Sequence, residues 1–479
     1  MQTLFEQLQQ YSRSEIYPYH MPGHKRQGMG ELSAGLAQLD ITEIEGFDNL
    51  HQPEGILQEM QQYAASVYGA EETFYLVGGS TCGILSAVSA AIPRGGKLLI
   101  ARNCHKSVYH AAYLRELQLS YLYPRLLPEI GICEAVTAGQ VQEALTAEPD
   151  VCGVLIVSPT YEGRIAEVER IAGVVHEYGI PLIVDEAHGA HLGFHPAFAA
   201  GSSRAGADLV VTSVHKTLPA MTQTALLHVK GKRIDRERLR RFLRIYQSSS
   251  PSYVLMASID NAVRLAAEGE ALFEQLYENW NSLLERLSVL KNLTVWPAAA
   301  MAKIEYQKHQ DIGKLVISVK NTDLTGKELY SRLLEEYGLQ MEMATDSYVL
   351  AMFTIGDTFD GYERLADALL EIDRGLKRTR QAEINREYPS GKREQVPFAR
   401  AWDTPGAWVP LKEAADRYVG EFLNIYPPGI PILVPGERME NADQRLIEQY
   451  LTDGLNVQGI SVREGVPGLK VLAEKYLSG

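Results

Sequence analysis

The chain has 479 residues, of which 46% are hydrophobic and 22% are charged, and its formal net charge is −14 at neutral pH. This composition is that of an ordinary globular protein and excludes a disordered or fibrous chain, while the length predicts two or three domains around one large core. The net negative charge argues against a nucleic-acid-binding surface and is compatible with a cationic small substrate.

The four cysteines, Cys82, Cys104, Cys133 and Cys152, are widely spaced and form no C-x-x-C motif or Cys/His cluster. Neither a zinc site nor a disulfide framework is therefore predicted, and reduced thiols are expected. The first residues lack the basic and apolar regions of a secretory signal, and no stretch reaches the roughly 18 uninterrupted apolar residues of a membrane span. We therefore expect a cytoplasmic protein that binds no membrane.

Residues 1–60 are predicted to form a short amphipathic helix followed by polar loops rich in Gly and Pro. Two unusual peptides occur there, at 19–26 and 42–55. Such segments make poor core, so they are either surface loops or pieces of a site.

From 61 to 290, apolar strands alternate with helices, a pattern that predicts a mostly parallel sheet covered by helices on both faces. The predicted strands lie at 73–77, 97–101, 153–157, 182–185, 208–212 and 225–229, and the helices run through 83–88, 106–117 and 257–290.

After Pro297 a smaller α+β unit is predicted, with strands at 314–319, 340–344 and 347–353 and helices at 327–337 and 360–377. The remaining chain is turn-rich, with a helix expected at 410–419. The predicted fold class is therefore α/β, with one large domain built on a mostly parallel sheet and smaller α+β domains after it. The expected boundaries are 1–60 for the N-terminal helix and loops, 61–290 for the large domain, 291–380 for the small domain and 381–479 for the C-terminal domain.

A glycine-rich turn, Gly78-Gly79-Ser80-Thr81, lies between a predicted strand and a helix. Free N–H groups and the positive end of the helix dipole can bind a phosphate at such a position, although a simple helix cap is the alternative. The turn matches neither a P-loop nor G-x-G-x-x-G, so a small phosphate fits better than a nucleotide.

Asp185 ends one predicted buried strand, and Lys216 follows another. An acid that pairs with a pyridine nitrogen and a lysine that forms a Schiff base suit pyridoxal phosphate, and Ser213 and His215 could bind its phosphate. The alternatives are a loop-anchoring acid and a lysine that turns outward. His105, at the end of another strand, could stack on a planar cofactor or be solvated.

His188 and His191 have the spacing of a pair of metal ligands, but no third ligand with suitable spacing accompanies them. No metal is therefore predicted.

Taken in order, these motifs resemble those of the Orn/Lys/Arg decarboxylases, which belong to the pyridoxal-phosphate fold type I (aspartate aminotransferase-like) superfamily. The matching peptides are collinear and cover nearly the whole chain. They lie at 21–25, 42–55, 79–81, 104–107, 158–163, 185–189, 213–217, 248–251 and 426–431. The chain is similar to the short members that lack an N-terminal receiver-like domain.

The resemblance implies a role for each candidate residue. Lys216 would bind pyridoxal 5′-phosphate covalently, Asp185 would pair with its ring nitrogen, and His105 would stack on the ring. The other implied cofactor-binding residues are Ser80, Thr81, Ala187, His188, Ser213 and His215, with Ser248 or Ser249 reaching the phosphate from a second subunit. A homodimer or higher homo-oligomer, with its active site at the subunit interface, would therefore be the active form.

The implied reaction is decarboxylation of a basic amino acid, arginine, lysine or ornithine, to a polyamine-pathway amine and CO2. Lys216 or a nearby histidine would return a proton to Cα. A distal cation on the substrate needs an acidic partner, and the candidates are Glu43, Glu45, Asp48, Glu54 and Glu421. The alternatives are another fold type I activity, such as an aminotransferase or lyase, and a catalytically silent homologue that binds the cofactor.

Overall fold

The computed structural model describes residues 2–14, 22, 34–127, 129–298, 309–379, 393–425, 430–452 and 454–473. The chain divides into two compact units. The first consists of Met1–Pro93 and Glu167–Gln275, and the second of Arg94–Ala166 and Leu276–Gly479. No helix in the described part of the chain is long and apolar enough to cross a membrane.

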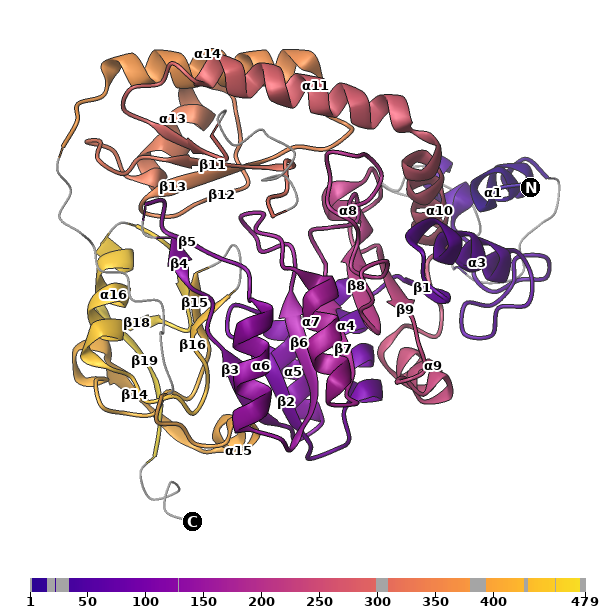
Figure 1. Ribbon diagram of the computed structural model, residues 1–479, viewed down its shortest axis with the longest axis horizontal. Coiled ribbons are helices and arrows are strands. Elements are labelled where there is room, and N and C mark those ends of the chain that lie inside the picture. The colour runs from indigo at the N-terminus through magenta and orange to yellow at the C-terminus, as the bar shows by residue number, and fades with distance from the viewer. Residues whose placement is uncertain are drawn as a thin grey trace. The chain divides into compact units, whose positions relative to one another are not determined.

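Four strands of the first unit lie in the order β1 (Glu72–Leu76), β9 (Ala225–Val229), β8 (Leu209–Ser213) and β7 (Leu182–Asp185) (Figure 1). β7 and β8 are parallel, whereas β9 is antiparallel to both β8 and β1. Every residue of β7, β8 and β9 is buried, as expected of strands that are covered on both faces. The continuous apolar runs in the sequence form strands for this reason.

The helices of the first unit are α1 (Leu4–Ser12), α2 (Ala34–Leu39), α3 (Ile56–Tyr68), α4 (Gly79–Ala91), α7 (Val168–Glu177), α8 (Val214–Thr217), α9 (Arg236–Tyr246) and α10 (Tyr253–Glu268). α4 packs closely on β1 and β8 at Gly83. A Cβ at this position would lie 2.6 Å from Leu76 Cδ1 and 2.8 Å from Val211 Cγ1. Only glycine therefore allows the helix to approach the strands this closely.

The second unit begins with three parallel strands in the order β6 (Val151–Val157), β2 (Lys97–Ala101) and β3 (Gln118–Leu122). Two helices, α5 (Lys106–Leu114) and α6 (Ala138–Ala147), and a short hairpin of β4 (Leu126–Leu127) and β5 (Ile132–Cys133) accompany these strands. The helix expected at 106–117 ends earlier, because the chain turns at Arg115 and Glu116 into the unpredicted strand β3.

An antiparallel sheet follows in the order β10 (Thr294–Trp296), β11 (Lys314–Ser318), β13 (Tyr348–Met352) and β12 (Met343–Ala344). It is accompanied by α13 (Gly326–Tyr337) and α14 (Phe359–Gly375). α14 runs alongside the C-terminal half of α11 (Glu270–Leu287), where Arg286 forms ion pairs with Glu363 and Asp367 (Figure 1). The single helix expected at 257–290 is thus two helices, α10 and α11, which are separated at Gly269.

The C-terminal segment of the second unit contains two small sheets, β14-β19-β18 and β16-β15-β17, around one apolar cluster. Its elements are α15 (Phe398–Asp403), β14 (Gly406–Pro410), η2 (Leu411–Glu413), β15 (Leu423–Ile425), β16 (Pro431–Leu433), α16 (Asn441–Thr452), β17 (Val457–Gln458), β18 (Ser461–Arg463) and β19 (Val466–Leu472). The helix predicted at 410–419 is wrong. Only a short 3-10 turn forms there, because Asp416 has a φ of 65°, which an α-helix cannot contain.

The predicted fold class is confirmed. The long strands of the two units are mostly parallel and are accompanied by helices, and smaller α+β sheets follow toward the C-terminus. The four domain boundaries expected from the sequence remain predictions.

Asp48 organises the peptide at 42–55, one of the two unusual N-terminal segments. Its carboxylate accepts hydrogen bonds from five backbone N–H groups, those of Asn49, Glu54, Gly55, Leu57 and Gln58. Because Gly55 has no side chain to cap α3, Asp48 caps that helix from outside. Burial alone raises the pKa of Asp48, but these hydrogen bonds outweigh it and hold the pKa below its usual value.

We predict that Asp48→Ala lowers the free energy of unfolding by about 2 kcal/mol, because several backbone donors lose a charged acceptor. Since the folded pKa is the lower one, this stabilisation is present above the unfolded pKa, and it is lost as the pH falls through the folded pKa. Denaturant unfolding from pH 7 to pH 3 checks both points. The control Glu45→Ala, at an exposed position in the same peptide, should change little; equal effects of the two variants would contradict the capping role.

Candidate active site

The carboxyl ends of β1, β8 and β7 lie at one edge of the first unit. β1 and β8 are both antiparallel to β9, so they run in the same direction, and β7 is parallel to β8. Leu76 and Ser213 both lie opposite Ala225 in the register of the strands. The turn that begins α4, the short helix α8 and the residues after Asp185 therefore leave the strands at the same edge.

Asp185 is the last residue of β7, and only 4% of it is exposed. Its Oδ1 accepts a hydrogen bond from the Ala187 N–H at 3.2 Å. Burial raises the pKa of Asp185, while the nearby Lys216 ammonium and the Ala187 N–H act in the opposite direction. The net result is a raised pKa, so this carboxyl favours a further cationic partner at the site.

Lys216 lies in α8, directly after β8. Its Nζ is 3.1 Å from Nε2 of His188, a residue that is 7% exposed and comes three positions after Asp185. The structure thus brings Asp185, His188 and Lys216 together. An amine and an imidazole at hydrogen-bond distance can exchange a proton, which general acid–base chemistry requires.

Two hydroxyl groups on either side of Lys216 in the sequence are buried without partners. Ser213 Oγ and Thr217 Oγ1 are both inaccessible to solvent and make no hydrogen bond. Buried polar groups in folded proteins nearly always have partners, so each exception requires an explanation. Two such donors beside a lysine are suited to an anionic ligand.

The N-terminus of α4 supplies further donors at this edge. Gly79 has a φ of 71°, a conformation that favours glycine, and its N–H donates to Gln223 O at 2.9 Å. Ser80, which is half-buried, and Thr81, which is exposed, follow in the first turn of the helix. The N-cap residue Gly78 has no side chain with which to cap the first turn of α4. The backbone N–H groups of that turn can therefore bind an anion.

His215 and the Ser248–Ser249 pair have different surroundings. The Nδ1–H of His215 donates to Thr224 O at 2.8 Å, and burial, with a smaller effect of Lys216, lowers the pKa of the imidazole. Ser248 and Ser249 are exposed, and Ser248 O accepts a hydrogen bond from His51 Nε2 at 2.7 Å.

His105 belongs to the second unit, where it caps the N-terminus of α5. Its Nδ1 accepts a hydrogen bond from the Ser107 N–H at 3.2 Å. Since Nδ1 carries no proton in this arrangement, the proton of the neutral ring lies on Nε2. The ring orientation is therefore set by the first turn of α5.

Five acids are candidates to bind the distal cation of a substrate, and four of them already have partners or are exposed to solvent. Asp48 is occupied by backbone N–H groups, Glu421 forms an ion pair with Lys470, Glu54 accepts from Gln52, and Glu45 is exposed. Glu43 differs, because its Oε1 is buried and makes no hydrogen bond. The predicted peptides at 19–26, except Pro22, and at 426–429 lie outside the described residues.

No group of three or more His, Cys, Asp or Glu side chains that could hold a metal occurs in the described part of the chain. His188 contacts Lys216, and the His191 ring packs edge-on against Phe198 at a centroid distance of 5.1 Å.

Two residues near the site were missed by sequence reasoning, Thr217 and Glu186. Thr217 directly follows the predicted lysine, and this position was the available signal. Glu186 is 2% exposed, and its carboxylate accepts hydrogen bonds from the N–H and Oγ of Ser202. Burial raises the pKa of Glu186 to about 8, against the effect of Ser202, so this acid is mostly neutral at pH 7.

Solved structures share this fold. The structure of the constitutive lysine decarboxylase of Escherichia coli matches with a TM-score of 0.84 at 20% identity, over 98% of this chain and 82% of the other. A structure of serine palmitoyltransferase (SPT) with PLP matches more distantly, with a TM-score of 0.53 at 15% identity over 66% of this chain and 76% of the other. These likenesses define an α/β fold that pyridoxal-phosphate enzymes also use.

Sequence comparison identifies the family. Residues 2–360 match the model of the Orn/Lys/Arg decarboxylase major domain, and residues 394–461 match that of the C-terminal domain. An arginine decarboxylase from Bacillus subtilis is 33% identical over 472 residues, which is 95% of each chain. The chain therefore belongs to the Orn/Lys/Arg decarboxylase family, as its motifs predicted, and is an amino-acid decarboxylase.

We predict that Glu186→Gln changes how stability depends on pH. The unfolded carboxyl loses its proton near pH 4.3, whereas the folded one keeps it until about pH 8, so unfolding releases a proton between these values. The wild type should therefore lose stability relative to the variant as the pH rises through this window, by up to about 1.4 kcal/mol per pH unit. Thermal midpoints from pH 5.5 to 9 measure the difference, and parallel curves for the two proteins would show that Glu186 is ionised in the fold.

Proposed function

We propose that this chain removes the α-carboxylate of a basic L-amino acid, arginine, lysine or ornithine, with pyridoxal 5′-phosphate (PLP) as cofactor, and releases the amine and CO2. The observation that carries the proposal is the proximity of buried Asp185 to Lys216 at the carboxyl ends of two neighbouring strands, where two buried hydroxyls lack hydrogen-bond partners. Membership of the Orn/Lys/Arg decarboxylase family supports the substrate class. The names of relatives from Bacillus subtilis and Bacillus anthracis favour arginine.

The described residues of the first unit fit PLP. Ser213 Oγ and Thr217 Oγ1 offer hydrogen bonds to a phosphate, as do the N–H groups around Ser80 and Thr81 at the start of α4. Burial deprives the Asp185 carboxylate of hydration, and a protonated ring nitrogen beside it would offset that cost. A phosphate dianion would likewise favour the protonated form of His215.

Bound PLP would supply an electron sink for the electron pair that remains when CO2 leaves. Asp185 would hold the proton on the ring nitrogen, and His105 would lie over the ring. Lys216 Nζ would form the covalent link to the cofactor in the resting enzyme. Because Nζ lies 3.1 Å from His188 Nε2, either atom can hold the proton that is returned to the substrate Cα.

Glu43 is the acid that we propose for the distal cation of the substrate. Its buried Oε1 has no hydrogen-bond partner. A charged guanidinium or ammonium group would satisfy such an oxygen with a charge-assisted hydrogen bond.

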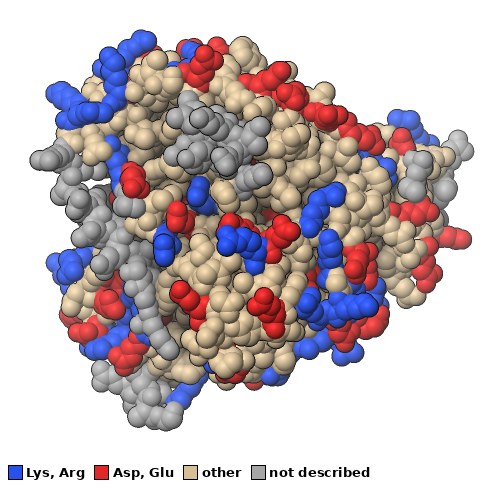
Figure 2. Space-filling view, in the orientation of Figure 1, with Lys and Arg blue, Asp and Glu red and all other residues tan. Residues whose placement is uncertain are grey.

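We further propose that the enzyme works in the cytoplasm as a homodimer or higher homo-oligomer and that its product enters polyamine synthesis. All four cysteines are free thiols, which is usual for proteins of reducing compartments. The exposed Ser248 and Ser249 are accessible to a second subunit. Figure 2 shows basic and acidic side chains intermixed on the visible face. The described residues of that face form no continuous basic surface of the kind that nucleic-acid binding requires.

A decarboxylation assay tests the function. We expect the purified enzyme with PLP to form CO2 and the corresponding amine from at least one of L-arginine, L-lysine and L-ornithine, with diaminopimelate as a fourth substrate in the panel. Keto acid without amine from all three basic amino acids would instead indicate an aminotransferase. Cofactor binding without any turnover would indicate a silent homologue.

The control for this assay is Lys216→Ala. We expect this variant to remain folded, to lose the visible absorption of lysine-bound PLP and to lose at least 100-fold in kcat, because the amine that carries the cofactor is gone. An unchanged absorption spectrum would remove Lys216 from its proposed role.

We predict that Glu43→Gln raises KM for the preferred substrate by about 10- to 100-fold, since a hydrogen bond to a charged group contributes roughly 1.5–3 kcal/mol. The same change at exposed Glu45 should leave KM within about twofold. Steady-state kinetics compare the two variants; a larger effect at Glu45 would transfer the substrate contact to that residue.

A further inference from the structure

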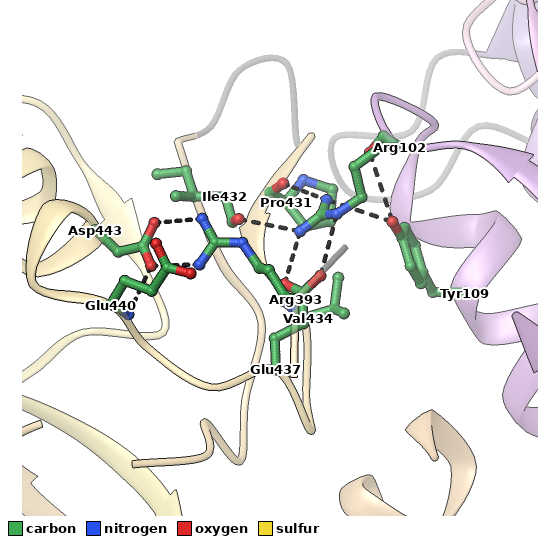
Figure 3. Close-up of polar contacts among 9 residues, drawn as sticks. All are labelled: Arg102, Tyr109, Arg393, Pro431, Ile432, Val434, Glu437, Glu440 and Asp443. Atoms are coloured by element: carbon green, nitrogen blue, oxygen red, sulfur yellow. Dashed lines mark hydrogen bonds and ion pairs between the residues drawn. The ribbon is translucent and has the colours of Figure 1, made fainter. Parts of the chain in front are cut away.

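Arg102 is a fully enclosed arginine at the start of the turn that leads to His105. The residue follows β2 directly and is only 1% exposed. Its guanidinium donates to both carboxylate oxygens of Glu437, with Nε to Oε1 at 3.3 Å and Nη2 to Oε2 at 2.8 Å. The remaining donors bond Pro431 O at 2.8 Å, Ile432 O at 3.0 Å and Tyr109 Oη at 3.4 Å (Figure 3). All five N–H groups of the side chain are thus used.

The turn that Arg102 begins is short and buried. The Arg102 N–H donates to Leu122 O at 2.8 Å and the Cys104 N–H to Ala101 O at 3.0 Å, and the chain reaches His105 three residues after Arg102. Tyr109, one turn into α5, also donates to Arg102 O. A shift of the Arg102 side chain would therefore displace both the turn and the helix that hold the imidazole.

At its other end, the guanidinium binds the C-terminal segment of the same unit. Pro431 and Ile432 begin β16, and Pro431 is also the last residue of the family motif at 426–431. Glu437 is 1% exposed, and its Oε2 also accepts from the Val434 N–H at 3.0 Å. The Arg102 guanidinium thus joins the motif at 426–431 to the turn that contains the motif residues Cys104 and His105.

Stability alone does not account for such a pair. The cost of removing two charges from water often equals or exceeds their attraction, so apolar side chains of similar size can stabilise a fold equally well. Burial alone lowers the pKa of Arg102, and Glu437 outweighs it, so the guanidinium stays charged. What the pair provides beyond stability is geometry, because a bidentate contact permits only one relative orientation of its two peptides.

We infer that Arg102 and Glu437 are positioning residues, which fix the His105 turn against β16 and thereby set the orientation of the His105 ring. The inference rests on the proposed function, in which that ring lies over PLP. Neither residue is assigned a contact with substrate or cofactor. The C-terminal segment contributes to the reaction through this contact.

A second buried ion pair of the same unit is a matched control. Arg393 donates to Asp443 through Nη1 at 2.5 Å and Nη2 at 2.8 Å, and the two side chains are 8% and 4% exposed (Figure 3). Asp443 also accepts from the Glu440 N–H at 2.9 Å. Neither Arg393 nor Asp443 hydrogen-bonds to the turn at 101–105, although Glu437 contributes to the raised pKa of Arg393.

The experiment compares paired apolar replacements in the purified holoenzyme. Arg102→Met with Glu437→Leu should lower kcat at least tenfold, change KM less than threefold and alter the visible circular dichroism of bound PLP, which reports ring orientation. Arg393→Met with Asp443→Leu should leave kcat and the dichroism within twofold of wild type. The assays use L-arginine, L-lysine and L-ornithine.

A test of mechanism adds His105→Ala. If Arg102 acts through His105, the paired replacement should cost less than twofold in kcat once the imidazole is absent, because the two effects are not additive. Arg102→Lys keeps the charge without the bidentate fork, so it should restore the thermal midpoint more fully than kcat. If the paired replacement does not fold, the comparison of Arg102→Lys with the wild type tests the inference.

Three results would overturn the inference: wild-type kcat and dichroism in the Arg102/Glu437 replacement, effects that add fully to those of His105→Ala, or full activity in Arg102→Lys. Absence of a PLP band in the wild type is a separate failure. It would remove the proposed function itself, and the positioning role with it.

Discussion

β7 and β8 run in the same direction and are buried on both faces. Polar side chains at their carboxyl ends therefore need hydrogen-bond or charge partners at that same edge of the sheet. Asp185 ends one strand, and Lys216 follows the other by three residues. Lys216 lies close enough to Asp185 to oppose the rise in its pKa that burial causes. The remaining features of the site follow from this pairing, because a buried acid and a nearby amine require groups that complete their charge and hydrogen bonding.

Protonation at this edge is governed by burial. Asp185 and Glu186 are adjacent carboxyls with little exposure, and burial raises the pKa of both. The partners differ: Glu186 accepts from the N–H and hydroxyl of Ser202, whereas Asp185 accepts from the Ala187 N–H and is influenced electrostatically by the nearby Lys216. Neighbouring acids of one peptide thus have different surroundings: Glu186 anchors the loop through Ser202, whereas Asp185 lies near a lysine.

Much of the fold could be predicted, because buried strands such as 182–185 appear in the sequence as continuous apolar runs. The helix expected at 410–419 could not be excluded in this way, since the left-handed backbone of Asp416 is not encoded in an apolar pattern. For the site, the order of the motifs indicated the family correctly, and the roles drawn from it remain predictions. The sequence could not show that Thr217 Oγ1 and Glu43 Oε1 lack hydrogen-bond partners, because this depends on residues distant in sequence.

The enclosure of Arg102 and Glu437 also has an evolutionary consequence. The two positions are 335 residues apart, yet the loss of either side chain leaves the other as an unpaired charge in the interior. A protein in which only one of the two residues is replaced is therefore destabilised, whereas one in which both are replaced avoids the unpaired charge. The two positions should accordingly be inherited together, and the two segments that carry them should be poorly exchangeable between relatives that have diverged at one position only.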